Sequence, residues 1–286
     1  MEESEQQKKK SSKKKKTKKK KTKKLESSSN SDINFPSIEN FQNLKTFLNQ
    51  SPPQPGSQWI DDIFPPNNTS ISNSQKFTDL FESEENDIDL TEIEWKRISE
   101  IYEEPQLFSG EINTKKIING KINSSYFISA ISAISDYPGL IKNIFINEKY
   151  NPDGFYTLIL FIDGEFQKVY IDDYFPCLKN SNILYFIKPS NFEIWPLLIE
   201  KAWAKVNGGY QNIINSWPID FFRALTGSAC DVLIHEDLSN DELFHELNFA
   251  DKNNGLCISL TKNRNDVTIK GLINHHMYIL VETEKI

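Results

Sequence analysis

Apolar and polar residues alternate most regularly in the stretch GFYTLILFIDGEFQKVYIDDYFP, residues 154–176. Its two apolar runs are separated by Asp163 and Gly164, a residue pair typical of tight hairpin turns. The pattern therefore predicts an antiparallel β-hairpin. A further short apolar run, NILYFIK at residues 182–188, predicts a third strand.

A different spacing marks residues 192–210, FEIWPLLIEKAWAKVNGGY. Apolar side chains recur there at the period of a helix, and these define its apolar face: Ile194, Leu197, Leu198, Ala202 and Val206. Pro196 is tolerated because it falls in the first turn. The run Asn207-Gly208-Gly209 is a natural C-cap, so we expect the helix to end there.

The remaining elements are shorter. Helices are predicted at 220–227 and 239–253, and strands at 230–236, 255–262 and 275–284. Residues 90–102, LTEIEWKRISEIY, fit either a short helix with Thr91 as its N-cap or an irregular packed segment. The first half is then mostly helix with one hairpin, and the second half is mostly strand. This order predicts an α+β fold with two lobes.

Charge divides the chain in a way that its net value of −7 conceals. Residues 1–24 hold 13 of the 33 Lys and Arg and 3 of the 40 Asp and Glu, so this arm carries +10 and the remainder −17. Because the arm has almost no apolar area to bury, we expect it to be disordered, followed by a polar linker at 25–57 with room for a short helix at 38–48. The arm is either a solvated tail, a nuclear-targeting signal or, through residues 8–24, a site that attracts nucleic acid or an anionic surface.

Composition argues against several classes of protein. No apolar run reaches the roughly 18 residues of a membrane-spanning helix, and residues 1–16 lack the apolar core of a secretory signal. The three cysteines are odd in number and widely spaced, which favours neither a disulfide framework nor a zinc site. A reducing, cytoplasmic or nuclear location is therefore predicted. We expect Cys230 and Cys257 to be small buried hydrophobes and Cys177 to be partly exposed.

Five segments together resemble the calpain-type cysteine proteases, a family with the papain fold. Residues 192–210 are very similar to that family's helix N-E-F-W-x-x-L-L-E-K-A-Y-A-K-V-N-G-S-Y, the most specific of the five matches. VYIDDYFP resembles V-x-V-D-D-x-L-P, and WIDDIFPPNNTSI is similar to F-x-D-x-x-F-P-P. GKINSSYFISAISAI aligns without a gap on Q-G-x-L-G-D-C-W-L-L-A-A-I-A-S-L, and GLINHHMYILVE on G-L-V-K-G-H-A-Y-S-V. The resemblance covers residues 59–286.

The resemblance implies a papain-like core of two lobes: a helical nucleophile lobe at 58–210 and a truncated, β-rich histidine lobe at 211–286. In that family a cysteine at a helix N-terminus acts as a thiolate, because the helix dipole and a nearby imidazolium lower its pKa. The histidine then protonates the leaving amine. A peptide or protein substrate or partner is expected in the cleft between the lobes.

The residues aligned with the family's catalytic positions differ from the family pattern. The alignment places Ser125 at the nucleophile and Asn119, one methylene shorter than the family's Gln, at the oxyanion-stabilising position. Tyr126 replaces the Trp after the nucleophile, and Asn123-Ser124 replace Gly-Asp before it. An alcohol holds its proton too tightly for a helix dipole and an imidazolium to generate a standing alkoxide, so the thiolate mechanism does not transfer to Ser125.

His276 matches the family's histidine, at the general-base position. His275 stands where the family has Gly, and we expect it to face solvent, while His235 and His245 are expected at the surface. The asparagine that orients the imidazole in the family should lie well past His276, beyond the last residue of the chain. That part of the triad is therefore expected to be absent.

The family binds calcium through carboxylates and carbonyls. Its ligand positions can be compared with the residues of this sequence in the same way. Glu193 matches one carboxylate ligand, but Lys116 stands where an Asp is expected, and an ammonium group cannot ligate a cation. Asp172 and Asp173 are interpreted as a structural strand end. No cofactor or metal is predicted.

These substitutions predict a degenerate calpain-like domain, a pseudoprotease that binds peptides or partners without cleaving them. Two alternatives stay open. One is an active or residual endopeptidase of the calcium-dependent calpain type. The other is an interaction protein that acts through its Lys-rich arm.

Overall fold

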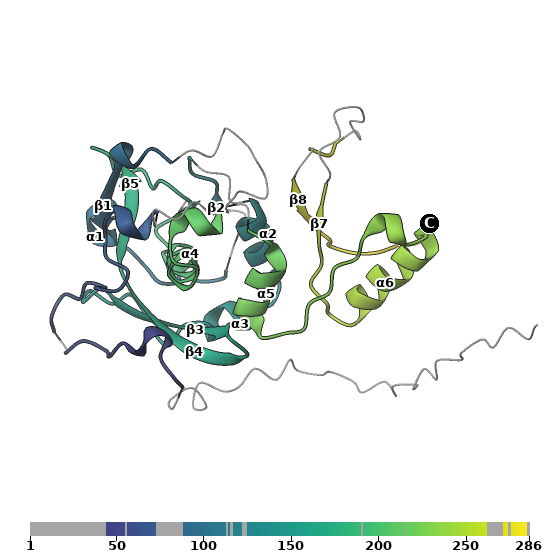
Figure 1. Cartoon of the computed structure of the whole chain (residues 1–286), viewed down its shortest axis with the longest axis horizontal. Coiled ribbons are helices and arrows are strands. Elements are labelled where there is room, and N and C mark those ends of the chain that lie inside the picture. Colours follow the sequence, from purple (N-terminus) through teal and green to yellow (C-terminus); the bar gives the residue numbers. More distant parts are fainter. Residues whose placement is uncertain are drawn as a thin grey trace, which may run out of the picture. The chain divides into compact units, whose positions relative to one another are not determined.

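A long antiparallel hairpin stands at the predicted place in the computed structural model (Figure 1). β3 (Phe155–Ile162) and β4 (Glu165–Asp172) pair along their whole length. Asp163 and Gly164 turn between them at φ values of 52° and 84°, the left-handed geometry that a two-residue hairpin loop requires. The predicted hairpin and its turn are confirmed.

The structure describes residues 44–54, 56–72, 88–112, 114, 117–121, 125–189, 191–214, 216–261, 271–273 and 276–284. All of them belong to one compact unit, Phe35–Ile286. The predicted arm at 1–24 and most of the linker lie outside the described residues. So do Lys116 and His275.

Residues 90–102 form neither of the two predicted arrangements. η5 (Leu90–Glu92), β1 (Ile93–Arg97) and α1 (Ile98–Ile101) follow one another directly. β1 pairs antiparallel with β5 (Tyr174–Leu178), so a distant strand supplies a ladder that the local pattern did not reveal. The N-cap prediction was wrong by two residues: Asp89 is the cap, and its carboxylate accepts a hydrogen bond from the Thr91 N–H at 2.9 Å.

The predicted strand at 182–188 is wrong in most of its length. Leu184 makes a single bridge to Cys177 of β5, and only the end of the segment enters a ladder. That ladder joins β6 (Lys188–Pro189) to β2 (Ile117–Ile118). The apolar residues from Leu184 to Ile187 are buried in the core as irregular chain, whereas Ile183 is 48% exposed. Burial therefore accounts for most of the apolar run in this segment.

α4 (Trp195–Val206) lies between the strand pairs (Figure 1) and is buried at every residue but the last. Its predicted end is confirmed, because Asn207 caps it and the Gly209 N–H donates to the Ala204 carbonyl at 2.8 Å. The sequence predicted that only the apolar face of this helix is buried. In the structure the polar residues of α4 are buried as well.

Three further helices pack into the same core: α2 (Ser125–Ile134), α3 (Pro138–Asn143) and α5 (Pro218–Thr226). Phe221 of α5 stacks on Phe127 of α2 with ring centroids 4.7 Å apart and lies 5.3 Å from the Trp203 ring of α4. α5 therefore shares one core with α2 and α4, and the division into two lobes at residue 210 stays a prediction. Short 3₁₀ turns complete this part: η2 (Phe47–Asn49), η3 (Asn68–Ser70) and η7 (Tyr210–Ile213).

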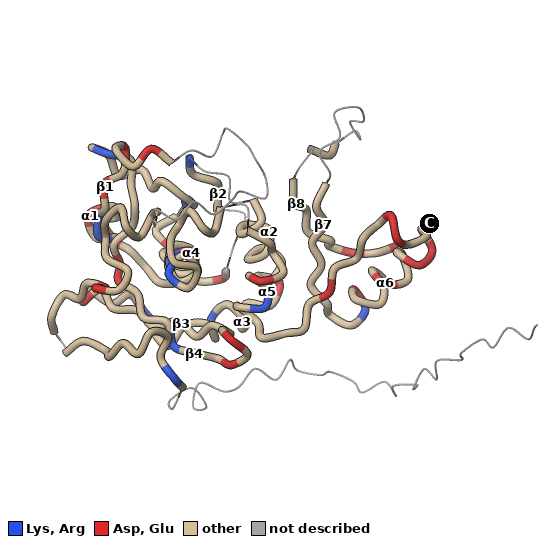
Figure 2. Tube along the Cα trace, viewed as in Figure 1, with Lys and Arg blue, Asp and Glu red and all other residues tan. Residues whose placement is uncertain are grey.

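The rest of the described chain holds η8 (His235–Asp237), α6 (Asn240–Lys252), β7 (Ile258–Leu260) and β8 (Met277–Ile279). α6 begins with a reciprocal capping box between Ser239 and Glu242, and β7 pairs antiparallel with β8. Acidic residues gather on and around α6 (Figure 2). The predicted strand at 230–236 is wrong, since those residues are extended or belong to η8 and pair with no strand that the structure describes.

The mixture of helices and small antiparallel sheets confirms the α+β class. Within the described residues, no helix combines the length and the apolar character needed to cross a membrane.

Candidate active site

Ser125 is the first residue of α2, at the helix N-terminus as the alignment requires. The two residues after it, Tyr126 and Phe127, are 3% and 1% exposed and fix this end of the helix in the core. Ser125 itself is half-buried. Its side chain therefore sits at the positive end of the helix dipole, which favours an anion there.

His276 lies just before β8, which packs beside α2 (Figure 1). Ser129, one turn along α2 from Ser125, donates its hydroxyl hydrogen to the Met277 carbonyl at 3.3 Å. The His276 backbone is tied to Thr261, and its half-buried imidazole meets the Tyr278 ring edge-on at 5.0 Å. The predicted nucleophile and base positions thus lie on two elements in direct contact.

Asn119 is an exposed residue that directly follows β2. The chain beyond it is fixed, because the Lys121 N–H donates to the Tyr185 carbonyl at 2.8 Å. A methyl group on Gly120 would overlap the Phe186 carbonyl oxygen, so only glycine allows the two backbones to approach this closely. The structure therefore places all three predicted site residues, and it brings together the elements of Ser125 and His276. Residues 122–124, between Asn119 and Ser125, lie outside the described chain.

Glu193, the predicted match to a calcium ligand, directs both carboxylate oxygens at donors of this chain. The N–H and the hydroxyl of Ser109 each donate to one oxygen at 2.7 Å, and the Asn191 amide donates to the other at 2.7 Å. Burial raises the pKa of Glu193, but these hydrogen bonds outweigh it and lower the pKa below its ordinary value.

The described residues contain no group of three or more His, Cys, Asp or Glu placed to hold a metal. With the Glu193 oxygens engaged in this way, the residues that the structure describes do not fit a calcium site, and no step of the chemistry is derived through one.

Asp172 and Asp173, at the end of β4, each hold a buried cation. Asp172 pairs with Lys201 of α4, and Asp173 pairs with Arg97 at 2.5 Å. Burial raises the pKa of Asp173, and the Arg97 guanidinium opposes that rise. Their interpretation as a structural feature agrees with these contacts.

The burial expected for the cysteines was reversed. Cys177, in the middle of β5, is fully buried because it pairs with Glu94 on one side and bridges Leu184 on the other. Burial raises the pKa of its thiol to about 12, so it is not a nucleophile. Cys230 and Cys257 are half-buried, and burial raises the pKa of each.

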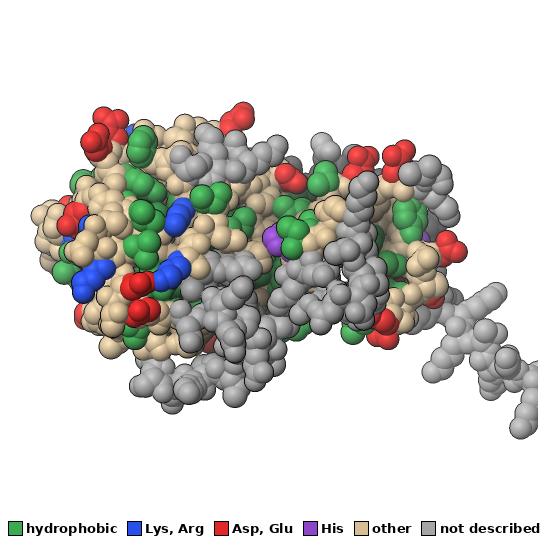
Figure 3. Space-filling view, turned by 90° about the horizontal axis from the view of Figure 1, so that it is seen from above, with side chains coloured by type: hydrophobic (Ala, Val, Ile, Leu, Met, Phe, Trp, Pro, Cys, Tyr) green, Lys and Arg blue, Asp and Glu red, His purple; other side chains and the backbone are tan. Residues whose placement is uncertain are grey.

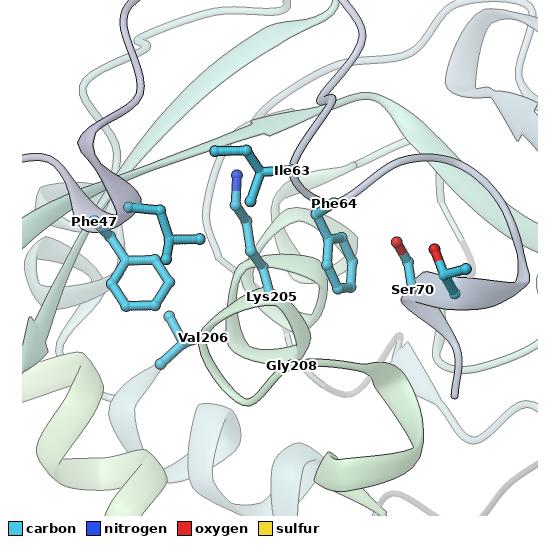
Figure 4. Close-up of a pocket in the computed structure, with 9 residues that line it drawn as sticks. Phe47, Ile63, Phe64, Ser70, Lys205, Val206 and Gly208 are labelled. Carbon is cyan, nitrogen blue, oxygen red and sulfur yellow. The ribbon is translucent and has the colours of Figure 1, made fainter. Parts of the chain in front are cut away.

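A hollow of about 340 Å³ lies elsewhere, between η2, η3 and the end of α4 (Figure 4). Its walls combine apolar side chains, among them Phe47, Ile63 and Phe64, with polar ones such as Ser70. The Lys205 amine beside it is committed to the Asp61 carboxylate at 2.5 Å and to the Tyr170 carbonyl at 2.7 Å. None of the three predicted site residues lines this hollow, so it is separate from the candidate site.

Sequence reasoning missed Ser129 and Glu200. Ser129 had a usable signal, since it lies four residues after Ser125 and so on the same helix face. Glu200 had no such signal, because a charged residue on the polar side of the predicted helix is expected to face solvent. It is 3% exposed, and burial raises its pKa to about 8 although a hydrogen bond from the Ile187 N–H opposes this.

Comparison with known proteins decides the family. The family model for calpain family cysteine proteases matches residues 59–286, most of the chain. The chain belongs to the calpain family.

Several curated calpains are similar to this chain. The calpain-type cysteine protease ADL1 of Oryza sativa subsp. japonica is 27% identical over 207 residues, which cover 68% of this chain and 10% of the rice protein. The calpain-type cysteine protease DEK1 of Arabidopsis thaliana is 26% identical over 245 residues, covering 80% of this chain and 11% of that protein. Calpain-5 of Caenorhabditis elegans is 24% identical over 239 residues, covering 77% of this chain and 35% of that protein. The chain spans between about a tenth and about a third of the length of these relatives.

Proposed function

We propose that this calpain-family chain binds extended peptides without cleaving them. The observation that carries the proposal is the hydroxyl group of Ser125 at the first residue of α2, where the alignment expects a thiol. A helix N-terminus stabilises an anion by roughly 0.3–1 kcal/mol. That is far too little to ionise an alcohol at neutral pH, whereas a thiol needs only a small shift.

Asn119 supports the same proposal. Its amide is one methylene shorter than the glutamine that the alignment expects, and the backbone after it is held against residues 185–186. The fixed backbone leaves little freedom to move the amide forward. Loss of one oxyanion donor typically costs about 10²–10³ in rate.

Peptide binding needs less than catalysis does. The helix of Ser125 and the strand after His276 are joined by the Ser129–Met277 hydrogen bond, so these two elements stay together whether or not a thiolate is present. Extended peptides bind to proteins mainly through backbone hydrogen bonds, which do not depend on a nucleophile.

A cytoplasmic or nuclear location is part of the proposal, and it rests on the three cysteines being free.

A residual serine-type peptidase is the second candidate, because the half-buried His276 directly precedes β8, the strand that contacts α2. In that case the neutral imidazole would act as the base for the Ser125 hydroxyl. Action through the Lys-rich arm is a third proposal. It predicts binding to anionic polymers that falls steeply with salt and is lost when residues 1–24 are removed.

The experiment compares the parent chain with Ser125→Cys, Ser125→Ala and Ser132→Cys, assaying casein hydrolysis with and without calcium and binding of a labelled casein peptide. Ser132 also lies on α2 but away from its N-terminus, so its variant controls for an added thiol. We expect saturable binding without hydrolysis by the parent. The Ser125→Cys thiol should be alkylated by iodoacetamide faster than the Ser132→Cys thiol.

Hydrolysis by Ser125→Cys alone would assign the loss of activity to the nucleophile. Absence of hydrolysis in every variant, with binding retained, would extend the loss to the oxyanion position. Hydrolysis by the parent that disappears in Ser125→Ala would refute the proposal and favour the residual peptidase.

A further inference from the structure

Thr261, the residue directly after β7, is bonded to both backbone groups of His276. The Thr261 N–H donates to the His276 carbonyl at 2.9 Å, and the His276 N–H donates to the Thr261 hydroxyl oxygen at 2.9 Å. The hydroxyl hydrogen of Thr261 has two carbonyl oxygens within reach, that of Ile273 at 2.6 Å and that of His276 at 3.0 Å. One threonine therefore connects the end of β7 to two positions of the segment that leads into β8.

Tyr278 of β8 holds the same segment through a second hydroxyl group. Its oxygen accepts a hydrogen bond from the Ile273 N–H at 2.7 Å, so the N–H and the carbonyl of Ile273 are each bonded to a side-chain hydroxyl. The Tyr278 ring also meets the His276 imidazole edge-on, with the ring centroids 5.0 Å apart. We call the hydroxyl groups of Thr261 and Tyr278 the hydroxyl clamp.

The imidazole of His276 depends on its backbone for its position. Among the described residues, none forms a hydrogen bond to its ring nitrogens, and its contacts are the backbone bonds and the Tyr278 ring. Because a side chain takes one of a few staggered rotamers, the place of the Cα atom largely determines where the ring lies. His276 is half-buried, and histidine is seen at the surface beside hydrophobic side chains in Figure 3.

We propose that Thr261 is a positioning residue, which sets where the His276 imidazole lies relative to residue 125. The Ser129–Met277 hydrogen bond joins α2 to the residue after His276, and Thr261 holds His276 itself from the end of β7. A displacement of about 1 Å is enough to weaken an interaction between two reacting groups severely. The inference rests on the site of Ser125 and His276 that the proposed function uses, but not on whether the parent chain cleaves peptides.

The test uses the thiol of Ser125→Cys as a probe of the imidazole. A nearby imidazolium lowers the pKa of a thiol, so iodoacetamide should alkylate residue 125 at lower pH when His276 is in place. The rate at residue 125 is measured in the full chain by peptide mass spectrometry, from about pH 4 to about pH 10. Adding His276→Ala should slow alkylation at about pH 6 by about tenfold.

The decisive variant adds Thr261→Val to Ser125→Cys. Valine keeps the shape of the threonine side chain and removes the hydroxyl group. We expect the pH profile to shift in the same direction as with His276→Ala, with alkylation at about pH 6 slowed by up to about tenfold. Thr261→Ser keeps the hydroxyl group and should restore the profile of Ser125→Cys.

Two further variants separate positioning from a general loss of stability. Tyr278→Phe keeps the ring and removes the second hydroxyl of the clamp, so it should shift the profile in the same direction as Thr261→Val. Thr283→Val is the matched control, because the Thr283 hydroxyl donates to the Asp251 carboxylate of α6 at 2.8 Å and the change removes a hydrogen bond of the same kind. It should leave the pH profile of residue 125 unchanged.

Three results would overturn the proposal. An unchanged profile in both Thr261→Val and Tyr278→Phe, with His276→Ala still effective, would refute the positioning role alone and leave the proposed function standing. Equal shifts in Thr261→Val and Thr283→Val would assign the effect to lost stability. If His276→Ala itself leaves the profile unchanged, His276 does not act on residue 125, and the shared site is wrong together with the positioning role.

Discussion

Ser129 and Met277, 148 positions apart in the chain, are joined by a hydrogen bond from the Ser129 hydroxyl to the Met277 carbonyl at 3.3 Å. Each residue lies close in the sequence to one of the predicted site residues. Ser129 is one helical turn from Ser125, and Met277 directly follows His276. The bond therefore sets how closely the helix and the strand of the candidate site approach.

Removing that bond should loosen β8. Ser129→Ala is expected to destabilise the fold by about 0.5–1.5 kcal/mol, the usual value of one hydrogen bond. Hydrogen exchange should quicken at the backbone amides of 277–280, while α4 keeps its protection. Ser132→Ala, on the same helix, is the control. Equal exchange in the two variants would mean that the bond does not hold the strand.

Glu200 should make stability depend on pH. Its pKa is raised to about 8 in the folded chain from an ordinary value of 4.5, so the folded state retains a proton that the unfolded state releases. The contribution of Glu200 to stability is then largest below pH 4.5, falls as the pH rises from 4.5 to 8, and stays low above 8.

The variant Glu200→Gln cannot ionise and should unfold at higher urea concentration at pH 8, by the equivalent of about 2–4 kcal/mol. At pH 5 it should differ little from the parent. Glu246→Gln, on the exposed surface of α6, is the control. A constant difference between pH 5 and pH 8 would show that Glu200 does not titrate in this way.

Gly120 should tolerate no side chain. Gly120→Ala forces the added methyl group into the Phe186 carbonyl oxygen and should displace the loop that follows Asn119. We expect a lower melting temperature and weaker peptide binding. Gly139→Ala is a matched control in α3, where nothing lies within 4 Å of the added carbon, and should stabilise the chain by about 0.5–1 kcal/mol. A folded Gly120→Ala variant that binds peptide normally would contradict the expectation.

Asp61 should be indispensable to the fold. Its carboxylate pairs with Lys205 at 2.5 Å, and both side chains are almost fully buried. Asp61→Asn leaves an unpaired buried ammonium and should cost about 3–5 kcal/mol in urea unfolding. Asp62→Asn, at the neighbouring exposed residue, should cost far less.

The double variant Asp61→Asn/Lys205→Met tests whether the lost stability comes from the buried charge that Asp61→Asn leaves without its counter-ion. Because it removes both charges, it should recover part of the loss. Additive effects of the two single changes would mean that the ion pair is not what makes Asp61 important.

Local signals predicted the hairpin and α4 correctly. A two-residue hairpin turn requires left-handed backbone, and Asp163 and Gly164 tolerate it at little cost. The Asn-Gly-Gly run ends α4 for the same kind of local reason. The strands at 182–188 and 230–236 failed because an apolar run shows only that residues avoid water. Whether such a run joins a ladder depends on a distant partner.

The buried charged residues of α4 show a second limit of prediction from the sequence. Lys201 and Lys205 are four residues apart on the predicted helix and look like a solvated stripe. Both are buried because Asp172 and Asp61 reach them from segments far away in the sequence. For the candidate site, the alignment placed Ser125 at the start of α2 and His276 beside β8. It could not show that Ser129 links the two elements.

The two ion pairs of α4 also restrict which substitutions the fold can tolerate. Asp172 accepts the Asp61 backbone N–H at 2.8 Å, so the pairs are coupled to each other as well as to the helix. A change at any one of the four residues leaves a buried charge without its partner, and an apolar replacement is tolerated only if its partner changes too. Substitutions at the surface face no such barrier. The buried ion pairs therefore constrain the core more strongly than the surface, and the core would tolerate substitutions at the predicted site residues better than substitutions at these four positions.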